Sequence, residues 1–396
     1  MKVLYIDKAC SIDEIRIGEQ KFFTELLPSY DVDTHLLLLG NGDNGYFKDN
    51  LTIHRRKNFN IYKNIISFDP VVVVLKLINL NKKYNFDVLV VRKSLTISLA
   101  LILVSQFINT KFVYMMSFPK WEMIRLKKQK YKLGVFIDLV SNLYEKSIKF
   151  VLKKSDLVIA KTKYFYNDFS KKHKIKKKNW TTYPMGFDNN LIPHEKSKIG
   201  LRIRHNLPID KPILIYFGSI DDERNPEFIL QIFKKVVNSN SSVFGLIIGG
   251  NESQKNRLID NLRGEGLQNK IKILSAIPRN VLFEYIYSSD MSISPIPPLS
   301  VYKISSPTKA IESMGLGVPV ICNREIYEQV EVIEESEGGV LVDYNIDSFA
   351  EAVLAVISDD EKLVLLKSNA AAYIQEYRLY ETMGRKLYNE LLKLTK

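Results

Sequence analysis

Short runs of apolar residues alternate with longer amphipathic segments along most of the chain. In the first half, polar loops bound five apolar runs, at residues 3–6, 35–39, 88–91, 112–115 and 157–160. Six more follow, at residues 213–217, 244–248, 271–274, 291–294, 318–322 and 339–342. Apolar strands separated by helices are typical of parallel sheets that are covered on both faces. Because the series occurs twice, the pattern predicts an α/β protein with two doubly wound, Rossmann-like domains.

A polar stretch without strand pattern lies between the two series and predicts the domain boundary. We expect a first domain over residues 1–190, a linker over 191–210 and a second domain over 211–376. The helical pattern at the end, residues 377–396, is expected to pack back on the first domain. The length of 396 residues agrees with two domains rather than one.

Composition and hydropathy exclude several classes of protein. The chain has only two cysteines, too few for a disulfide framework or a cysteine zinc site. Its first residues lack the pattern of a signal peptide. The most apolar window, residues 95–108, is shorter than the roughly 20 residues that span a bilayer, so it predicts a buried core helix. We expect a cytoplasmic protein, with peripheral contact to the inner face of the cell membrane left open.

The most informative segment covers residues 305–320. Ser306 suits the N-cap of a helix and Pro307 its first helical position, while Gly315 and Gly317 end it. The start of such a helix offers free backbone N–H groups to a phosphate or diphosphate. Hydroxyl groups and one ammonium group surround these N–H groups, from Ser305, Ser306, Thr308 and Lys309.

An acidic residue follows on the same predicted helix. Glu312 lies three residues beyond Lys309, on the same face, and its carboxylate could accept hydrogen bonds from a ribose diol. The alternative is an ordinary capped helix with an exposed Lys309–Glu312 pair. Other predicted strands end in loops that suit the same ligand: Gly218 and Ser219 followed by Arg224, and Gly249 with Gly250.

Taken in order, these segments resemble the retaining nucleotide-sugar glycosyltransferases of family 4 (glycosyl transferases group 1), which have the GT-B fold of two Rossmann-like domains facing a central cleft. The resemblance is best over residues 212–394. It implies that Glu312 binds the donor ribose, that Arg224 binds the diphosphate, and that Ser305, Ser306 and Lys309 surround the phosphates and the sugar. Gly18 falls in the family's first strand-to-helix loop, where it would approach the donor or the acceptor. A simple turn glycine is the alternative for Gly18.

Three positions depart from the family pattern and put the sugar contacts in doubt. Ile304 occupies the place of a second glutamate, and Ser219 occupies that of an arginine after the strand glycine. The histidine after the fourth strand of the first domain is absent, and Ser117 is the candidate substitute there. An inactive, degenerate member of the family is therefore an open alternative.

The resemblance implies transfer of a hexose-type sugar, with retention, from a nucleotide-diphosphate sugar to a glycan acceptor. We expect a lipid-linked acceptor and a role in bacterial surface polysaccharide or lipopolysaccharide biosynthesis. No metal or cofactor is expected, because the five histidines are scattered and residues 221–223 read as a solvated acidic loop. Without a metal, Arg224, Lys309 and the helix start would stabilise the leaving diphosphate.

The positive charge predicts an anionic partner. The chain has 57 basic and 44 acidic residues, a formal net charge of +13. One basic segment with an aromatic residue is expected to meet the acceptor or an anionic membrane: Lys120, Trp121, Arg125, Lys127 and Lys128. A second lysine cluster lies at residues 171–178. The alternative is a solvated lysine-rich surface.

Two other functions compete with sugar transfer. A sugar-nucleotide epimerase could share the architecture, but it needs acid and base groups that this histidine-poor chain does not obviously provide. Nucleic-acid binding could follow from the charge, but no recognition motif accompanies the basic runs, and we expect no nucleic-acid partner.

Overall fold

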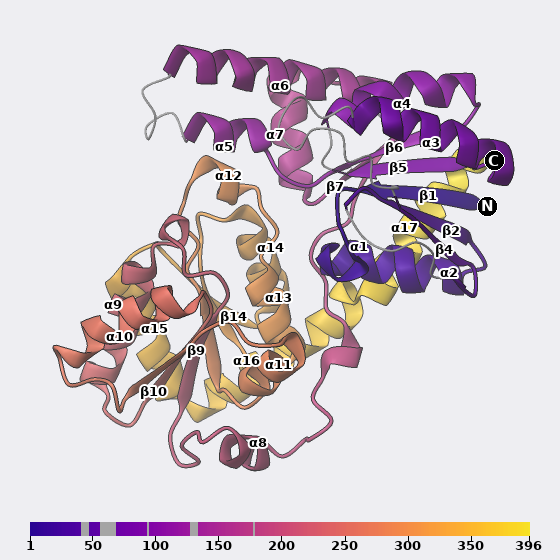
Figure 1. The fold of residues 1–396 in the computed structure, drawn as a ribbon. Helices are drawn as coiled ribbons and strands as arrows, with labels where there is room; N and C mark the ends of the chain where they lie inside the picture. The colour runs from indigo at the N-terminus through magenta and orange to yellow at the C-terminus, as the bar shows by residue number, and fades with distance from the viewer. Residues whose placement is uncertain (41–46, 56–68, 93–94, 127–133, 177–178) are drawn as a thin grey trace. The chain divides into compact units, whose positions relative to one another are not determined.

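The computed structural model describes residues 1–40, 47–55, 69–92, 95–126, 134–176 and 179–396. It divides the chain into two compact units, each with its own sheet (Figure 1). Unit 1 comprises Met1–Pro184 and Tyr380–Lys396, and unit 2 comprises Met185–Leu379.

The sheet of unit 1 has eight strands in the order β3-β4-β2-β1-β5-β6-β7-β8, all parallel except β3. The five predicted strands are confirmed as β1 (Lys2–Asp7), β2 (Asp33–Leu38), β5 (Val88–Arg92), β6 (Lys111–Met116) and β7 (Leu157–Ala160). The pattern missed β3 (Phe47–Lys48), β4 (Leu51–Arg55) and β8 (Trp180–Thr182). These strands lie at or near the sheet edges: β3 and β8 have only two and three residues, and in β4 polar residues alternate with Leu51 and Ile53.

Helices cover both faces of this sheet (Figure 1). One face carries α3 (Asp69–Tyr84), α4 (Leu95–Phe107) and α6 (Gly134–Lys154), with α4 in contact with both of the others. The other face carries α1 (Ile17–Lys21), a π-helical turn (Phe22–Leu26), α2 (Leu27–Ser29) and α17 (Tyr380–Thr395). The C-terminal helix α17 buries Tyr380, Leu387 and Leu391 in the core of unit 1.

Helix α4 differs from the prediction of a fully buried core helix. Ile97, Leu101 and Ile102 are buried, but Leu103 and Phe107 are exposed. Its apolar residues therefore surround the helix on all sides, and only one side faces the sheet. In the described part of the chain, no helix combines the length and the apolar character needed to cross a membrane.

The sheet of unit 2 has six parallel strands in the order β11-β10-β9-β12-β13-β14. All six predicted strands are confirmed: β9 (Ile213–Phe217), β10 (Phe244–Ile248), β11 (Ile271–Leu274), β12 (Met291–Ser294), β13 (Val320–Asn323) and β14 (Gly339–Val342). Helices α9 (Pro226–Ser239), α10 (Glu252–Arg263) and α15 (Ile346–Ile357) contribute to one core. The second core contains α11 (Arg279–Tyr287), α13 (Thr308–Gly315), α14 (Tyr327–Ser336) and α16 (Asp360–Tyr373).

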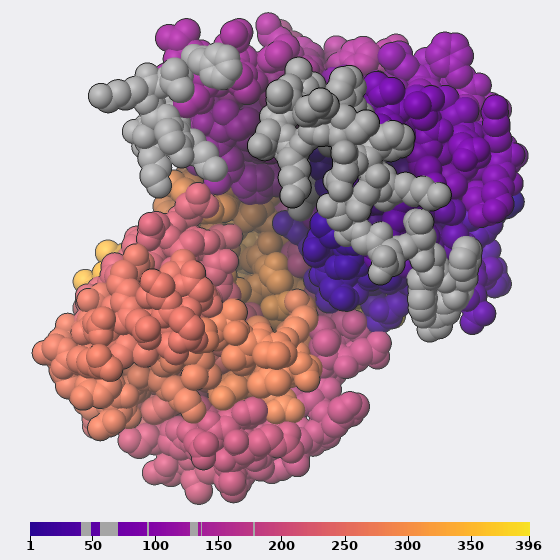
Figure 2. Space-filling view, in the orientation of Figure 1, coloured from indigo at the N-terminus to yellow at the C-terminus, as the bar shows by residue number. Residues whose placement is uncertain are grey.

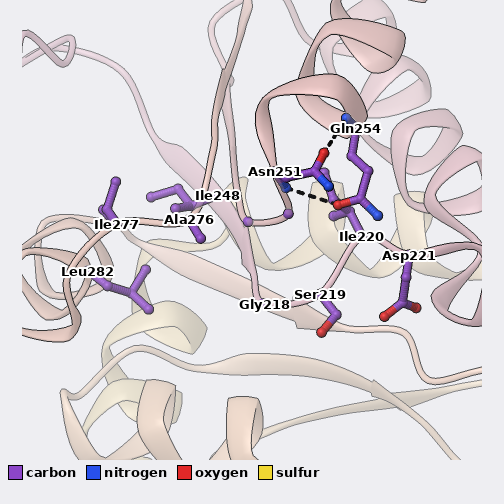
Figure 3. A pocket seen from close by; sticks show the side chains of 12 residues that line it. Gly218, Ser219, Ile220, Asp221, Ile248, Asn251, Gln254, Ala276, Ile277 and Leu282 are labelled. Carbon is purple, nitrogen blue, oxygen red and sulfur yellow. Dashed lines mark hydrogen bonds between the residues drawn. The ribbon is translucent and has the colours of Figure 1, made fainter. Parts of the chain in front are cut away.

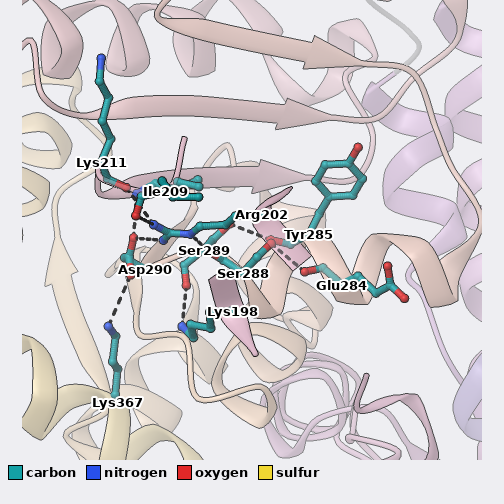
Figure 4. Close-up of polar contacts among 11 residues, drawn as sticks. Lys198, Arg202, Ile209, Lys211, Glu284, Tyr285, Ser288, Ser289, Asp290 and Lys367 are labelled. Carbon is teal, nitrogen blue, oxygen red and sulfur yellow. Dashed lines mark hydrogen bonds and ion pairs between the residues drawn. The ribbon is translucent and has the colours of Figure 1, made fainter. Parts of the chain in front are cut away.

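Residues 191–210 do not form the linker that the polar composition predicts. They contain α8 (Lys198–Arg204), which packs on α11 within unit 2. Arg202 is buried and fastens α8 to the sheet: its guanidinium donates to the Ser288 carbonyl at 2.9 Å and to the Asp290 carboxylate at 2.6 Å (Figure 4). Polar residues in this stretch thus make ion pairs and helix caps, and unit 2 begins at Met185 instead of residue 211.

Candidate functional site

A cavity of about 470 Å³ lies where the strands β9, β10 and β11 of unit 2 end (Figure 3). This is the edge at which parallel α/β sheets usually bind ligands. Its walls differ in character. Ile277 and Leu282 provide an apolar wall, and the glycine-containing loops after β9 and β10 provide a polar wall of backbone groups.

At two positions in these loops, only glycine fits. Gly218 has a φ of +117° and Gly249 a φ of +156°. A Cβ atom on Gly249 would lie 1.8 Å from the Gly218 carbonyl oxygen, so the two loops touch backbone to backbone. Four residues predicted to bind the donor therefore meet at this cavity: Gly218, Ser219, Gly249 and Gly250.

The start of α13 differs by one residue from the prediction. Pro307, not Ser306, is the N-cap, and no side chain caps the helix. The Ser306 hydroxyl accepts a hydrogen bond from the Met185 N–H at 2.8 Å, and the Ser305 hydroxyl donates to the Tyr302 carbonyl at 2.7 Å. The Ser306 hydroxyl thus holds a distant chain segment, which the local sequence could not indicate, whereas the Ser305 hydroxyl bonds within its own turn. Thr308, half-buried, is the first helical residue.

Lys309, on the first turn of α13, extends to the loop after β9. Its Nζ lies 5.1 Å from the centre of the Tyr216 ring and would be 3.1 Å from a Cβ atom on Gly218. Across the described residues, no hydrogen bond or ion pair engages this ammonium group. Burial, and after it the charge of Arg224, lowers the pKa of Lys309 to about 7. An anion at this point would raise that pKa and supply the missing partner.

Arg224 joins the same cluster from a 3₁₀ turn after β9 (Asp222–Arg224). Its guanidinium lies 4.3 Å from the centre of the Tyr302 ring, which belongs to the short helix α12 (Ser300–Lys303). Arg224 also acts electrostatically on Lys309. Two cations from separate elements, Arg224 and Lys309, thus lie close enough to act on each other, with Lys309 beside Gly218.

Glu312 is buried and forms an ion pair with Arg279, at the start of α11. The predicted alternative, an exposed Lys309–Glu312 pair, does not form. Burial raises the pKa of Glu312, and the Arg279 guanidinium opposes that rise. The sequence reasoning missed Arg279. Its position between the apolar wall residues Ile277 and Leu282 was the available signal, although nothing in the sequence pairs it with Glu312.

Two predicted residues lie in unit 1. Gly18 lies inside helix α1, where it is buried, and not in a loop or turn. Its carbonyl accepts a hydrogen bond from the Tyr183 hydroxyl at 3.1 Å, and a Cβ atom on it would lie 2.8 Å from the Tyr380 ring. Ser117 follows β6 and is half-buried. Contacts of either residue with a substrate stay a prediction.

In the described part of the basic segment near Trp121, only one of the predicted residues is exposed. Trp121 is buried, with its ring 5.0 Å from that of Phe169. Arg125 forms ion pairs with Glu122, at 2.9 Å, and with Glu145. Only Lys120 is exposed, and Lys127 and Lys128 lie outside the described residues. Trp121 is thus a core residue, because the amphipathic helix α5 (Lys120–Leu126) turns it inward.

At the carboxyl edge of the sheet in unit 1, the charged groups pair with one another. The Glu19 carboxylate lies 3.1 Å from Lys161 Nζ and 3.4 Å from Arg92 Nε, and Arg92 Nη1 lies 3.1 Å from Asp7. All four side chains are buried. Burial would raise the pKa of Glu19, but Lys161, Arg92 and Arg16 hold it below its ordinary value.

Among the residues that the structure describes, no group of three or more His, Cys, Asp or Glu side chains could hold a metal ion. Whether the reaction uses a metal stays a prediction.

Comparison with known proteins bears on both units. Residues 198–373, all within unit 2, match the family described as glycosyl transferases group 1. No curated protein matches the sequence.

Solved structures resemble the whole chain. A sucrose-phosphate synthase of Thermosynechococcus elongatus is 16% identical with a TM-score of 0.76, over 99% of each chain. HepE of Anabaena, in complex with UDP, is 16% identical with a TM-score of 0.71, over 99% of this chain and 100% of its own. WaaG, a glycosyltransferase involved in lipopolysaccharide biosynthesis, is 12% identical with a TM-score of 0.68, over 99% of each chain. The chain therefore has the GT-B fold, and residues 198–373 of unit 2 are similar to the group 1 glycosyltransferases.

Proposed function

We propose that the protein transfers a hexose-type sugar from a nucleotide-diphosphate sugar to a glycan acceptor, with retention and without a metal ion. The observation that carries this proposal is the position of Lys309. Its ammonium group has no described ion-pair partner and points to Gly218, at the rim of the cavity at the carboxyl edge of unit 2.

The lining of the cavity and the charged residues near it suit the parts of such a donor. The diphosphate would lie between the glycine loops and the start of α13, where Lys309, Arg224 and the first N–H groups of the helix offer positive charge. The base would pack on Ile277 and Leu282. Glu312 would accept hydrogen bonds from the ribose, with Arg279 holding one of its oxygens in place. HepE, which shares the fold, was also solved with UDP-glucose.

Charge grows on the leaving diphosphate as the glycosidic bond breaks. Cations already aimed at that charge lower the barrier, because they need not reorganise during the reaction. Lys309 and Arg224 would act in this way. For retention, the acceptor would attack from the face that the leaving group occupies, with a phosphate oxygen taking the proton of the acceptor hydroxyl. This step follows from the resemblance to family 4.

We propose a lipid-linked saccharide as the acceptor, in surface polysaccharide or lipopolysaccharide biosynthesis in the cytoplasm. The distribution of charge supports an anionic acceptor. Unit 1 contains 37 basic and 18 acidic residues, a formal charge of +19, whereas unit 2 contains 20 and 26, a formal charge of −6. A lipid diphosphate would therefore be attracted to unit 1.

Thermal-shift measurements against UDP-, GDP-, ADP- and CMP-sugars test the donor, since a ligand that binds the folded protein raises its melting temperature. Turnover of the donor that binds is then measured in the Glu312→Ala variant. We expect loss of turnover. The control is Glu334→Ala, which removes an exposed carboxylate on α14 and should leave turnover unchanged. Full activity in Glu312→Ala would contradict the proposed site.

A further inference from the structure

Three neighbouring helices of unit 1 expose large apolar side chains on the side away from the sheet. Helix α4 packs between α3 and α6, and all three bury their other side in the unit (Figure 1). In the space-filling view, the purple residues of α4 and α6 lie at the surface of unit 1 (Figure 2). We call the exposed side of these helices the α3–α4–α6 face.

The pattern on α6 is a continuous stripe. Val135, Leu139 and Leu143 follow one another at four-residue intervals, and their exposed fractions are 87%, 64% and 64%. Lys146 and Phe150 continue the same side of the helix, at spacings of three and four residues, and both are exposed. A surface helix of a soluble protein normally carries polar residues at such positions.

The two neighbouring helices repeat this pattern. On α4, Leu103 and Phe107 are four residues apart, and Phe107 is 89% exposed. On α3, Val71 and Leu75 are also four residues apart and exposed. Exposed apolar residues that occur singly need no explanation, but three adjacent helices with aligned pairs or stripes indicate an interaction surface.

Lysines accompany the apolar residues of this face. Helices α3 and α6 end in Lys82 and Lys83, and in Lys153 and Lys154, all exposed, and α6 also exposes Lys146. Within the described ranges, none of these five lysines forms an ion pair. Helix α4 has no charged residue. The acidic Glu145 of α6 is buried and points to Arg125, Lys172 and His173.

We propose that the α3–α4–α6 face docks on an anionic lipid bilayer, with its apolar residues in the interface and its lysines at the headgroups. An anionic bilayer suits a protein face on which lysines lie beside exposed Leu, Val and Phe. Burial of the apolar side chains and attraction of the lysines to anionic lipid then act together. A second copy of the chain fits less well, because two units of formal charge +19 repel each other. Nucleic acid would use the lysines but would leave the apolar stripe in water.

This surface differs from the basic segment near Trp121 that the sequence suggested. It also extends the proposed function, because a docked enzyme would meet a lipid-linked acceptor within the membrane surface. Only the benefit of meeting a lipid-linked acceptor rests on the proposed function. Docking itself requires no donor, no acceptor and no turnover.

Vesicle flotation with the purified full chain tests the proposal. Vesicles of phosphatidylcholine alone are compared with vesicles that also contain phosphatidylglycerol. We expect the chain to float with the anionic vesicles, and high salt to weaken the binding. The Leu139→Gln/Leu143→Gln variant should bind on the order of tenfold more weakly, because both side chains are exposed and contribute to docking alone.

The matched control lies in unit 2. Val364 and Leu365 on α16 are about as exposed as Leu139 and Leu143, so Val364→Gln/Leu365→Gln should leave vesicle binding unchanged. Equal binding by the α6 variant and the wild type would overturn the proposal. So would failure of the wild type to bind anionic vesicles, or a dimer that the α6 variant alone dissociates in sedimentation.

Donor binding separates this proposal from the proposed function. The α6 variant should retain the thermal shift that a nucleotide-sugar produces, and Glu312→Ala should retain vesicle binding. Loss of vesicle binding in Glu312→Ala would contradict docking through the α3–α4–α6 face.

Discussion

The two units use the same edge of the same kind of sheet in opposite ways. In unit 1, buried Glu19, Lys161, Arg92 and Asp7 neutralise one another at the carboxyl edge. In unit 2, Lys309 and Arg224 converge beside a cavity, and the nearest buried carboxylate, Glu312, is paired elsewhere. The formal net charges would suggest the opposite, because unit 1 carries +19 and unit 2 carries −6. The net charge of a unit therefore does not indicate whether the cations at its sheet edge are paired, and only the contacts of the individual side chains do.

Removing the buried cation of unit 1 should have the largest effect on stability. Lys161→Met leaves Glu19 buried with Arg92 as its remaining close partner, so we expect unit 1 to lose about 3 kcal/mol of unfolding free energy. Hydrogen exchange of the β1 and β5 amides measures this change in unit 1 alone. Lys171→Met, on the exposed surface of α7 (Lys163–His173), is the control and should leave exchange unchanged. Unchanged exchange in Lys161→Met would show that the cluster does not stabilise the unit.

Removing the corresponding cation of unit 2 should affect activity instead. Lys309→Met should lower kcat/KM by about 10²–10³-fold, because the lysine would stabilise the leaving diphosphate. Its unfolding free energy should change little, since no described ion pair is lost. Lys303→Met on α12 serves as the control. A Lys309→Met variant with normal kcat/KM, or one that is unfolded, would contradict the expectation that this lysine serves activity and not stability.

The pH dependence of donor binding tests the role of Lys309 in unit 2 further. The pKa of Lys309 is lowered to about 7 in the free protein, and a bound diphosphate would raise it. Above pH 7 the donor must therefore bind together with a proton, and its affinity should fall by up to about tenfold per pH unit. Calorimetry in buffers of different ionisation enthalpy measures this proton uptake. Lys309→Met should bind weakly at every pH, without proton uptake.

The Glu312–Arg279 pair provides a smaller effect. Arg279→Met leaves a buried carboxylate without its cation, so the pKa of Glu312 should rise further and unit 2 should lose about 1–3 kcal/mol. Because a protonated Glu312 is a poorer acceptor for the ribose, donor affinity should become pH-dependent, and it should recover as the pH rises. The double variant Arg279→Met/Glu312→Gln should regain stability but not activity. Stability that stays low in the double variant would mean that the pair is not the cause.

A further effect concerns acid stability, which should differ between the units. In unit 1, His54 lies 2.8 Å from His35, and burial, with His35 as the next cause, lowers the pKa of His54 to about 4. The unfolded histidine binds a proton below its ordinary pKa of about 6.5, whereas the folded one does not until about pH 4. Unit 1 should therefore lose stability as the pH falls from about 6.5 to about 4.

This loss of stability is measured by comparing hydrogen exchange in the two units. Hydrogen exchange at pH 7 and pH 5 should show faster opening of β2 and β4, which carry this pair, and little change at β9 and β10. His54→Gln should reduce the effect in unit 1. An equal response of both units would assign acid sensitivity to something other than these histidines.

The sequence alone determined the strand–helix order, the two Rossmann-like units and the glycine loops of the candidate site. These follow from local rules: a buried parallel strand needs a continuous apolar run, and the positive φ angles at Gly218 and Gly249 favour glycine. The missed strands β3, β4 and β8 contain polar residues that interrupt the apolar run, so they carry no such signal.

Only the tertiary structure decided which polar groups pair. Glu312 with Arg279, Ser306 with the Met185 N–H, and the burial of Trp121 join residues that are far apart in the sequence. Among the described residues, the tertiary structure likewise left Lys309 without an ion-pair partner and the α3–α4–α6 face exposed. The energy of a charge depends on what surrounds it in space, and periodicity along a chain records only which side of one helix or strand faces inward.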